Sequence, residues 1–245
     1  MKRTLKGKEN PIIVALDVPT WPEAESLVVQ LSPIVDFFKI GMELFTAAGP
    51  AAVEAVKAAG SRVFLDLKYH DIPNTVRGAV AAAARLRVDM LTVHTSGGAL
   101  MMRAAAEAAG SAPHQPILLG VTVLTSIDAQ ILHRELRIEE ELNDQVAHLG
   151  EMAVANGING LVASPLEIAH LRQVLGDEVI IVTPGIRPAW EKPKDQRRVA
   201  TPQEAIALGA DYLVVGRPIT AAPDPREAAM RILAELGETN GGGRK

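Results

Sequence analysis

Three charged side chains stand close together at the end of a short apolar run. Asp66 and Lys68 follow the apolar residues 63–65, and Asp71 comes three positions after Lys68. Side chains two positions apart on a strand share a face, so Asp66 and Lys68 are expected to point the same way. Charges at the end of a buried strand are costly unless they are paired or used. This spacing makes the segment the first candidate for chemistry.

The chemistry that such a cluster supports follows from its charges. A lysine flanked by carboxylates keeps its proton, because nearby negative charge favours the ammonium form. Lys68 is therefore a poor nucleophile for imine formation and a good proton donor or stabiliser of a carbanion. The alternative is a structural network of ion pairs. We favour catalysis for the set as a whole, because a buried ion pair contributes little net stability and apolar packing would meet a structural need more simply.

The elements that position these residues follow from the hydrophobic pattern. Short apolar runs predict strands over residues 12–18, 37–41, 62–68, 90–95, 117–125, 160–164, 179–183 and 212–216. Amphipathic stretches between and after them predict helices over residues 21–31, 50–59, 74–86, 99–109, 143–156, 165–175, 202–208 and 225–236. Near-continuous apolar strands joined by helices indicate a parallel sheet. Eight such units in 245 residues predict a single-domain (β/α)8 TIM barrel, with a doubly wound open sheet as the alternative.

Composition sets limits on organisation and location. The net charge of −4 gives no basic surface for nucleic acid, and the absence of cysteine excludes disulfides and thiol catalysis. No apolar run approaches the roughly 20 residues of a membrane span, and the basic N-terminus lacks the apolar segment of a signal peptide. We therefore expect a cytoplasmic protein without a membrane partner. Residues 1–11 are expected to form an N-terminal extension, residues 12–237 the catalytic barrel and residues 238–245 a flexible C-terminal tail.

Catalytic residues of such barrels lie at the C-terminal ends of the strands. Asp17 closes the first predicted strand, Lys39 lies near the end of the second, and Asp66 and Lys68 close the third. Three consecutive strands therefore bring acids and lysines to one rim of the barrel.

The last two strands carry a second signal on the same rim. The eighth predicted strand ends at Gly216 and Arg217, and the seventh is followed by Gly185 and Arg187. Loops after these strands often bind phosphate. A glycine lets the phosphate approach the backbone, and the planar guanidinium group of an arginine can donate two hydrogen bonds to it. The alternative is that Gly216 is a turn glycine and Arg217 a solvated charge. The long basic connection over residues 184–200 is a candidate lid over an anionic ligand.

Further polar residues are harder to assign. Thr122, Thr125 and Ser126 lie at the end of the fifth predicted strand, where their hydroxyls could bind a polar ring or cap the next segment. His94 ends the fourth strand, and a structural role is favoured for it. The remaining histidines lack the spacing of metal ligands, so no metal site is expected.

The segment DLKYHDIPNT at residues 66–75 resembles the signature of the orotidine 5'-phosphate decarboxylase family. Five further blocks resemble segments of this family in the same order, at residues 15–17, 38–41, 121–126, 184–187 and 215–217. The resemblance covers roughly residues 12–236. It implies a cofactor-free decarboxylation of orotidine 5'-phosphate to uridine 5'-phosphate, the last step of de novo pyrimidine synthesis.

The same resemblance implies roles for individual residues. Lys68 would donate the proton to C6 of the pyrimidine, Asp66 would lie beside the substrate carboxylate, and Lys39 would join the array and contact the ribose with Asp17. Asp71 and Ile72 would reach the active site of a neighbouring subunit in a homodimer. The remaining implied substrate contacts lie near the pyrimidine or the phosphate: Thr75, Thr125, Ser126, Arg187, Gln196, Gly216 and Arg217.

Two alternatives remain at this stage. A magnesium-dependent sugar-phosphate decarboxylase or synthase shares the barrel and a similar Asp-x-Lys-x-x-Asp array. The extension at residues 72–75, the segment at residues 122–126 and the long seventh connection favour the nucleotide enzyme. A catalytically inactive barrel that senses a phosphorylated metabolite is disfavoured by the intact charged array.

Overall fold

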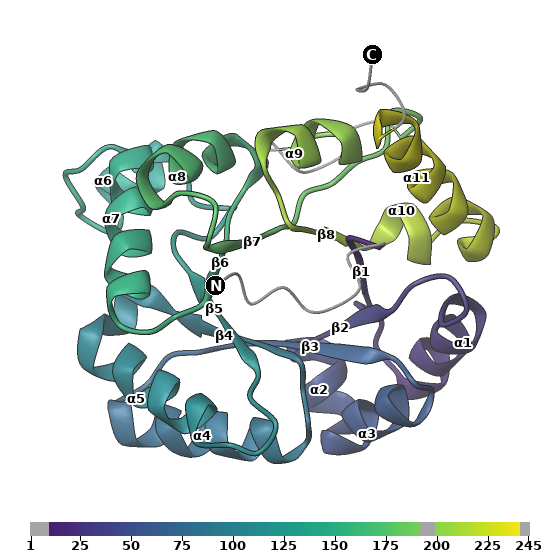
Figure 1. Cartoon of the computed structure of the whole chain (residues 1–245), viewed down its shortest axis with the longest axis horizontal. Helices are drawn as coiled ribbons and strands as arrows, with labels where there is room; N and C mark the ends of the chain where they lie inside the picture. The colour runs from purple at the N-terminus through teal and green to yellow at the C-terminus, as the bar shows by residue number, and fades with distance from the viewer. Residues whose placement is uncertain (1–9, 192–198, 241–245) are drawn as a thin grey trace.

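The computed structural model describes residues 10–191 and 199–240. Its strands pair in parallel in chain order, and β8 pairs with β1 to close the barrel. Figure 1 shows the helices around the outside of this ring. The strands are β1 Ile12–Ala15, β2 Phe37–Gly41, β3 Arg62–Tyr69, β4 Met90–His94, β5 Ile117–Val121, β6 Gly160–Val162, β7 Ile180–Thr183 and β8 Tyr212–Val215. The predicted (β/α)8 barrel is confirmed, and the open sheet is excluded.

The helices expected from the amphipathic pattern are all present. They are α1 Trp21–Leu31, α3 Pro50–Ala58, α4 Pro73–Arg85, α5 Gly98–Gly110, α7 Leu142–Ala155, α8 Ile168–Leu175, α9 Pro202–Leu208 and α11 Pro225–Asn240. A single 3-10 turn, η1 Thr95–Gly97, precedes α5, and another, η2 Pro165–Glu167, precedes α8. No helix in the described parts of the chain combines the length and apolar character needed to cross a bilayer.

Several element boundaries differ from the prediction. Helices α2 Met42–Ala48, α6 Ala129–Arg134 and α10 Arg217–Thr220 were not expected; they have seven, six and four residues, and such short segments give only a weak helical period. Strands β1 and β5 end earlier than predicted, because apolar residues beyond them pack on the core after the chain has left the sheet. The tail boundary expected after residue 237 falls inside α11.

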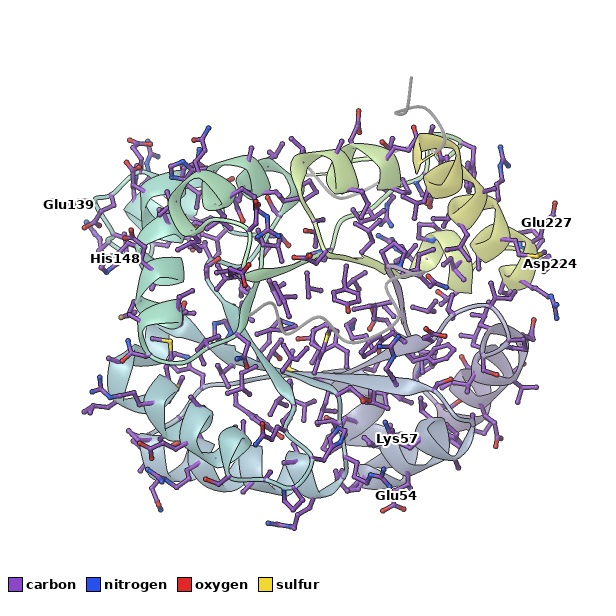
Figure 2. The ribbon with its side chains drawn as sticks, viewed as in Figure 1. Glu54, Lys57, Glu139, His148, Asp224 and Glu227 are labelled. Atoms are coloured by element: carbon purple, nitrogen blue, oxygen red, sulfur yellow. The ribbon has the colours of Figure 1, made fainter. Side chains whose placement is uncertain are left out.

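Strand alternation separates the inside of the barrel from the helix layer. Apolar side chains fill the inside of the ring (Figure 2), and the large ones near the strand starts are Phe37, Phe64, Met90 and Tyr212. Two positions further along β2, β3 and β4, the same inward face carries Lys39, Asp66 and Thr92. The interior of the barrel is therefore apolar towards its N-terminal end and charged at its C-terminal end.

An acid or amide precedes each even-numbered strand and fastens it to its neighbour at the opposite, N-terminal end of the barrel. In three cases the side chain accepts a hydrogen bond from a backbone N–H of the preceding strand: Asp89 from Val63 at 2.8 Å, Asn159 from Leu118 at 3.2 Å and Asp211 from Ile181 at 2.9 Å. In the fourth, Arg62 donates to Asp36 at 2.9 Å. These contacts hold the N-terminal end in register, away from the charged rim.

Candidate active site

A cavity of about 410 Å³ opens at the C-terminal end of the barrel. Its size is typical of a small-molecule site. Eight of the residues proposed from the sequence line it: Asp17, Lys39, Asp66, Lys68, Thr125, Arg187, Gly216 and Arg217. Apolar side chains of the barrel interior form the rest of its wall, among them Ala15, Phe64, Val162 and Val214.

Acids and amines alternate along one wall of this cavity. Lys39 Nζ lies 2.8 Å from Asp17 Oδ1 and 3.8 Å from Asp66 Oδ2. Lys68 Nζ lies 2.9 Å from both carboxylate oxygens of Asp66. The Asp66 side chain is 13% exposed and the Asp17 side chain 59%, so the row runs from the solvent edge inward. The amines of Lys39 and Lys68 thus share one mostly buried carboxylate.

The backbone at Lys68 departs from regular strand geometry. Lys68 has a φ of 51°, and the pairing of β3 with β4 shifts register between Leu65 and Tyr69. The side chains of Asp66 and Lys68 meet, as expected, but simple alternation is not the reason. A β-bulge turns Lys68 so that its amine reaches back to Asp66, and bulges of this kind often adjust side chains near active sites.

The segment after β3 does not contribute to the cavity lining that the described residues form. Asp71, Ile72 and Thr75 are exposed, and none of them lines the cavity among the described residues. Asp71 Oδ1 accepts a hydrogen bond from the backbone N–H of Ile72 at 2.7 Å, and Ile72 is 68% exposed. Ser126 is likewise exposed, whereas Thr125 lines the cavity. The charged array in the wall of this cavity therefore contains Asp66 but lacks Asp71.

Two arginines form the wall opposite the lysines. Arg187 is buried, and its backbone N–H donates to the carbonyl of Ala200 at 2.9 Å, which fixes the loop after β7. Gly185 in the same loop has a φ of 78°, a conformation that favours glycine. Arg217 follows Gly216 at the end of β8. Gln196 lies outside the described residues, as do Lys192, Lys194, Arg197 and Arg198 of the candidate lid.

A histidine pair lies beside the array. The rings of His70 and His94 have centroids 5.3 Å apart. Burial lowers the pKa of His94, and the positive charges of His70 and Lys68 lower it further, against a smaller opposing effect of Asp66. His94 is therefore neutral at pH 7 and adds no charge to the lysine side of the cavity.

Two site residues escaped the sequence analysis. A Cβ placed on Gly41 would stand 3.0 Å from Lys39 Nζ and 3.2 Å from Asp17 Oδ1, so a larger residue would press on both ends of this ion pair. Strand alternation could have found Gly41, which lies two positions after Lys39. Thr92 donates to Asp66 Oδ1 at 3.0 Å, and it carries no local signal because its contacts depend on how β3 pairs with β4.

The side chains that the structure describes do not form a cluster suited to a resident metal. Within residues 10–191 and 199–240, no three histidine or acidic side chains converge closely enough to hold one. The acids of the cavity are instead interleaved with lysines.

A closed (β/α)8 barrel with a row of lysines and acids at its C-terminal rim is the architecture of an enzyme that stabilises charge on a small substrate. The chain belongs to the family described as "Orotidine 5'-phosphate decarboxylase / HUMPS family", which matches residues 10–232. It is 55% identical over 233 residues to the orotidine 5'-phosphate decarboxylase of Moorella thermoacetica, covering 93% of this chain and 92% of that protein.

Solved structures show the same relationship. The crystal structure of orotidine 5'-phosphate decarboxylase from Lactobacillus acidophilus matches with a TM-score of 0.81 and 40% identity, covering 93% of this chain and 99% of that one. The enzyme of the same name from Pyrococcus horikoshii matches with a TM-score of 0.75 and 26% identity, covering 92% and 99%. The fold and the family resemblance seen in the sequence are thus confirmed.

Proposed function

We propose that this protein decarboxylates orotidine 5'-phosphate to uridine 5'-phosphate without a metal or organic cofactor, in the de novo pyrimidine pathway. The observation that carries the proposal is the paired amine of Lys68, held against Asp66 in the cavity wall. The family includes more than one chemistry, but relatives at 47% to 55% identity bear the name of this decarboxylase.

The proposed mechanism uses Lys68 twice. When the bond between C6 and the carboxylate breaks, carbon dioxide leaves and the electron pair stays on C6. The ammonium of Lys68, already oriented by Asp66, stabilises this charge without reorganisation of solvent. Lys68 then transfers its proton to C6 and recovers one from solvent. Asp66 lies beside the departing carboxylate, and Lys39 completes the positive side of the array.

The other cavity residues bind the rest of the nucleotide. Arg187, Arg217 and Gly216, with Gln196 of the lid, take the phosphate. Thr125 and Ser126 lie at the pyrimidine end, and Asp17 with Lys39 contacts the ribose. Binding energy from the phosphate, remote from C6, helps to assemble the site and raise the rate of the chemical step.

The active unit is a homodimer in the cytoplasm. Asp71, Ile72 and Thr75 follow β3 in the chain and are exposed, and they are not among the described residues that line the cavity. In the dimer, Asp71 and Ile72 reach the neighbouring subunit's cavity, where Asp71 supplies the remaining acid. An exposed isoleucine beside an exposed acid suits such a contact, because the apolar side chain gains from burial.

The direct test is turnover of orotidine 5'-phosphate by the purified protein in excess chelator. We expect carbon dioxide release and uridine 5'-phosphate formation at the same rate with and without chelator. Activity that chelator abolishes and magnesium restores would favour the metal-dependent sugar-phosphate enzymes of the same family. Binding of uridine 5'-phosphate without any turnover would favour the sensor.

A further inference from the structure

One residue of β4 faces the whole bulge of β3. The register pairs Leu65 with Leu91 and Tyr69 with Val93. Residues 66–68 of β3 therefore lie opposite a single residue of β4, Thr92. Thr92 is fully buried, so solvent does not reach its hydroxyl to take over its contacts.

The Thr92 hydroxyl contacts both parts of the bulge. Its oxygen accepts a hydrogen bond from the backbone N–H of Lys68 at 2.8 Å. Its single proton goes to Asp66 Oδ1 at 3.0 Å. The backbone N–H can only donate and a carboxylate can only accept, so the hydroxyl accepts from Lys68 and donates to Asp66. One hydroxyl thus ties the backbone of Lys68 to the carboxylate that holds its amine.

We propose that Thr92 is a positioning residue for the decarboxylation, acting through Lys68 and Asp66. This inference rests on the proposed function and deepens it. Lys68 has a left-handed φ of 51°, which a non-glycine residue keeps only where its surroundings enforce it. The bond from Lys68 N–H to Thr92 replaces the ladder bond that the bulge removes. The hydrogen bond from Thr92 to Asp66 fixes the position of that carboxylate. The carboxylate in turn fixes the position of the Lys68 amine.

Substitutions at Thr92 separate this role from packing. Thr92→Val keeps the volume but removes both hydrogen bonds, whereas Thr92→Ser keeps the hydroxyl. Thr183→Val is a matched control: Thr183 is equally buried, faces the helix layer, and its hydroxyl has no hydrogen-bond partner in the described structure. A misplacement of catalytic groups by about 1 Å costs roughly 100-fold in rate, so we expect a loss of this order in kcat for Thr92→Val.

The closing experiment measures kcat, KM and melting temperature for these variants and the wild type. We expect Thr92→Val to lower kcat with KM nearly unchanged, Thr92→Ser to restore kcat to within a few-fold, and Thr183→Val to match the wild type. Equal kcat for Thr92→Val and Thr183→Val, both folded, would overturn the inference. Wild-type protein without turnover would instead remove the proposed function itself.

A second variant keeps the test decisive if Thr92→Val does not fold. Thr92→Cys has nearly the shape of Thr92→Ser but carries a thiol, which donates and accepts hydrogen bonds only weakly. We expect it to fold and to lose kcat more than Thr92→Ser. Full activity of Thr92→Cys would overturn the positioning role.

Discussion

The amine of Lys68 lies 2.9 Å from both oxygens of Asp66. The group proposed to protonate C6 is therefore held by the acid that would face the departing carboxylate. This pairing holds the amine in place before substrate binds, and it makes Lys68 the residue on which turnover should depend most strongly.

Lys68→Ala should abolish turnover while binding of uridine 5'-phosphate largely survives, because the amine acts on charge that develops at C6 during the reaction. The control is Lys57→Ala. Lys57 lies on α3 outside the strand ring (Figure 2) and pairs with the buried Asp89 at 2.8 Å. Losing that pair should lower the melting temperature without lowering kcat. Steady-state kinetics, thermal melts and product titration check both variants, and equal turnover in Lys68→Ala and wild type would remove Lys68 from the mechanism.

Gly41→Ala should disable the site without unfolding the barrel. The new Cβ would stand 3.0 Å from Lys39 Nζ and 3.2 Å from Asp17 Oδ1, so this ion pair must shift to make room. We expect kcat/KM to fall by at least about tenfold, since displaced catalytic groups are costly. A glycine with open space, Gly237 in α11, serves as control. Gly237→Ala should leave kinetics unchanged and raise stability by up to about 1 kcal/mol. Wild-type kinetics in Gly41→Ala would show that Lys39 tolerates displacement.

The barrel and its charged rim were predictable because both depend on local patterns. Apolar runs and amphipathic stretches fixed the strands, and the end of each strand located Asp17, Lys39 and Asp66. The bulge at Lys68 was not predictable, because it arises where β3 pairs with β4 across a separation of more than 20 residues. Thr92 was missed for the same reason. The exposure of Asp71 depends on the turn after the bulge, which strand periodicity does not describe.

Arg187→Met should weaken binding of the phosphorylated nucleotide selectively. The variant keeps most of the buried side-chain volume but removes the charge that faces the cavity from the loop after β7. Hydrogen bonds to charged groups contribute about 1.5–3 kcal/mol, so we expect a loss of roughly 10- to 100-fold for uridine 5'-phosphate. Affinity for uridine, which lacks the phosphate, should hardly change. Calorimetric titration of both ligands checks this, and an equal loss for both would place Arg187 elsewhere on the nucleotide.

Mixing two inactive variants should restore activity if Asp71 acts in the neighbouring subunit. Lys68→Ala and Asp71→Ala subunits would form a hybrid dimer with one complete site. Random exchange makes half of the dimers hybrid, so about a quarter of wild-type activity should return. Mass spectrometry of differently tagged subunits verifies the exchange. Verified exchange without activity would place Asp71 in its own subunit's site or outside the mechanism.

His94 should make the free energy of unfolding depend on pH. Burial, with the charges of His70 and Lys68, holds its folded pKa below the usual value of 6.5. As the pH falls, His94 is therefore protonated in the unfolded chain before it is protonated in the folded protein. The stability that neutral His94 contributes is complete above about pH 6.5 and is lost as the pH falls towards its folded pKa. We expect the free energy of unfolding to fall more steeply between about pH 7 and pH 5 in wild type than in His94→Gln. Urea unfolding across this range measures the difference, and parallel curves for the two proteins would contradict the shift.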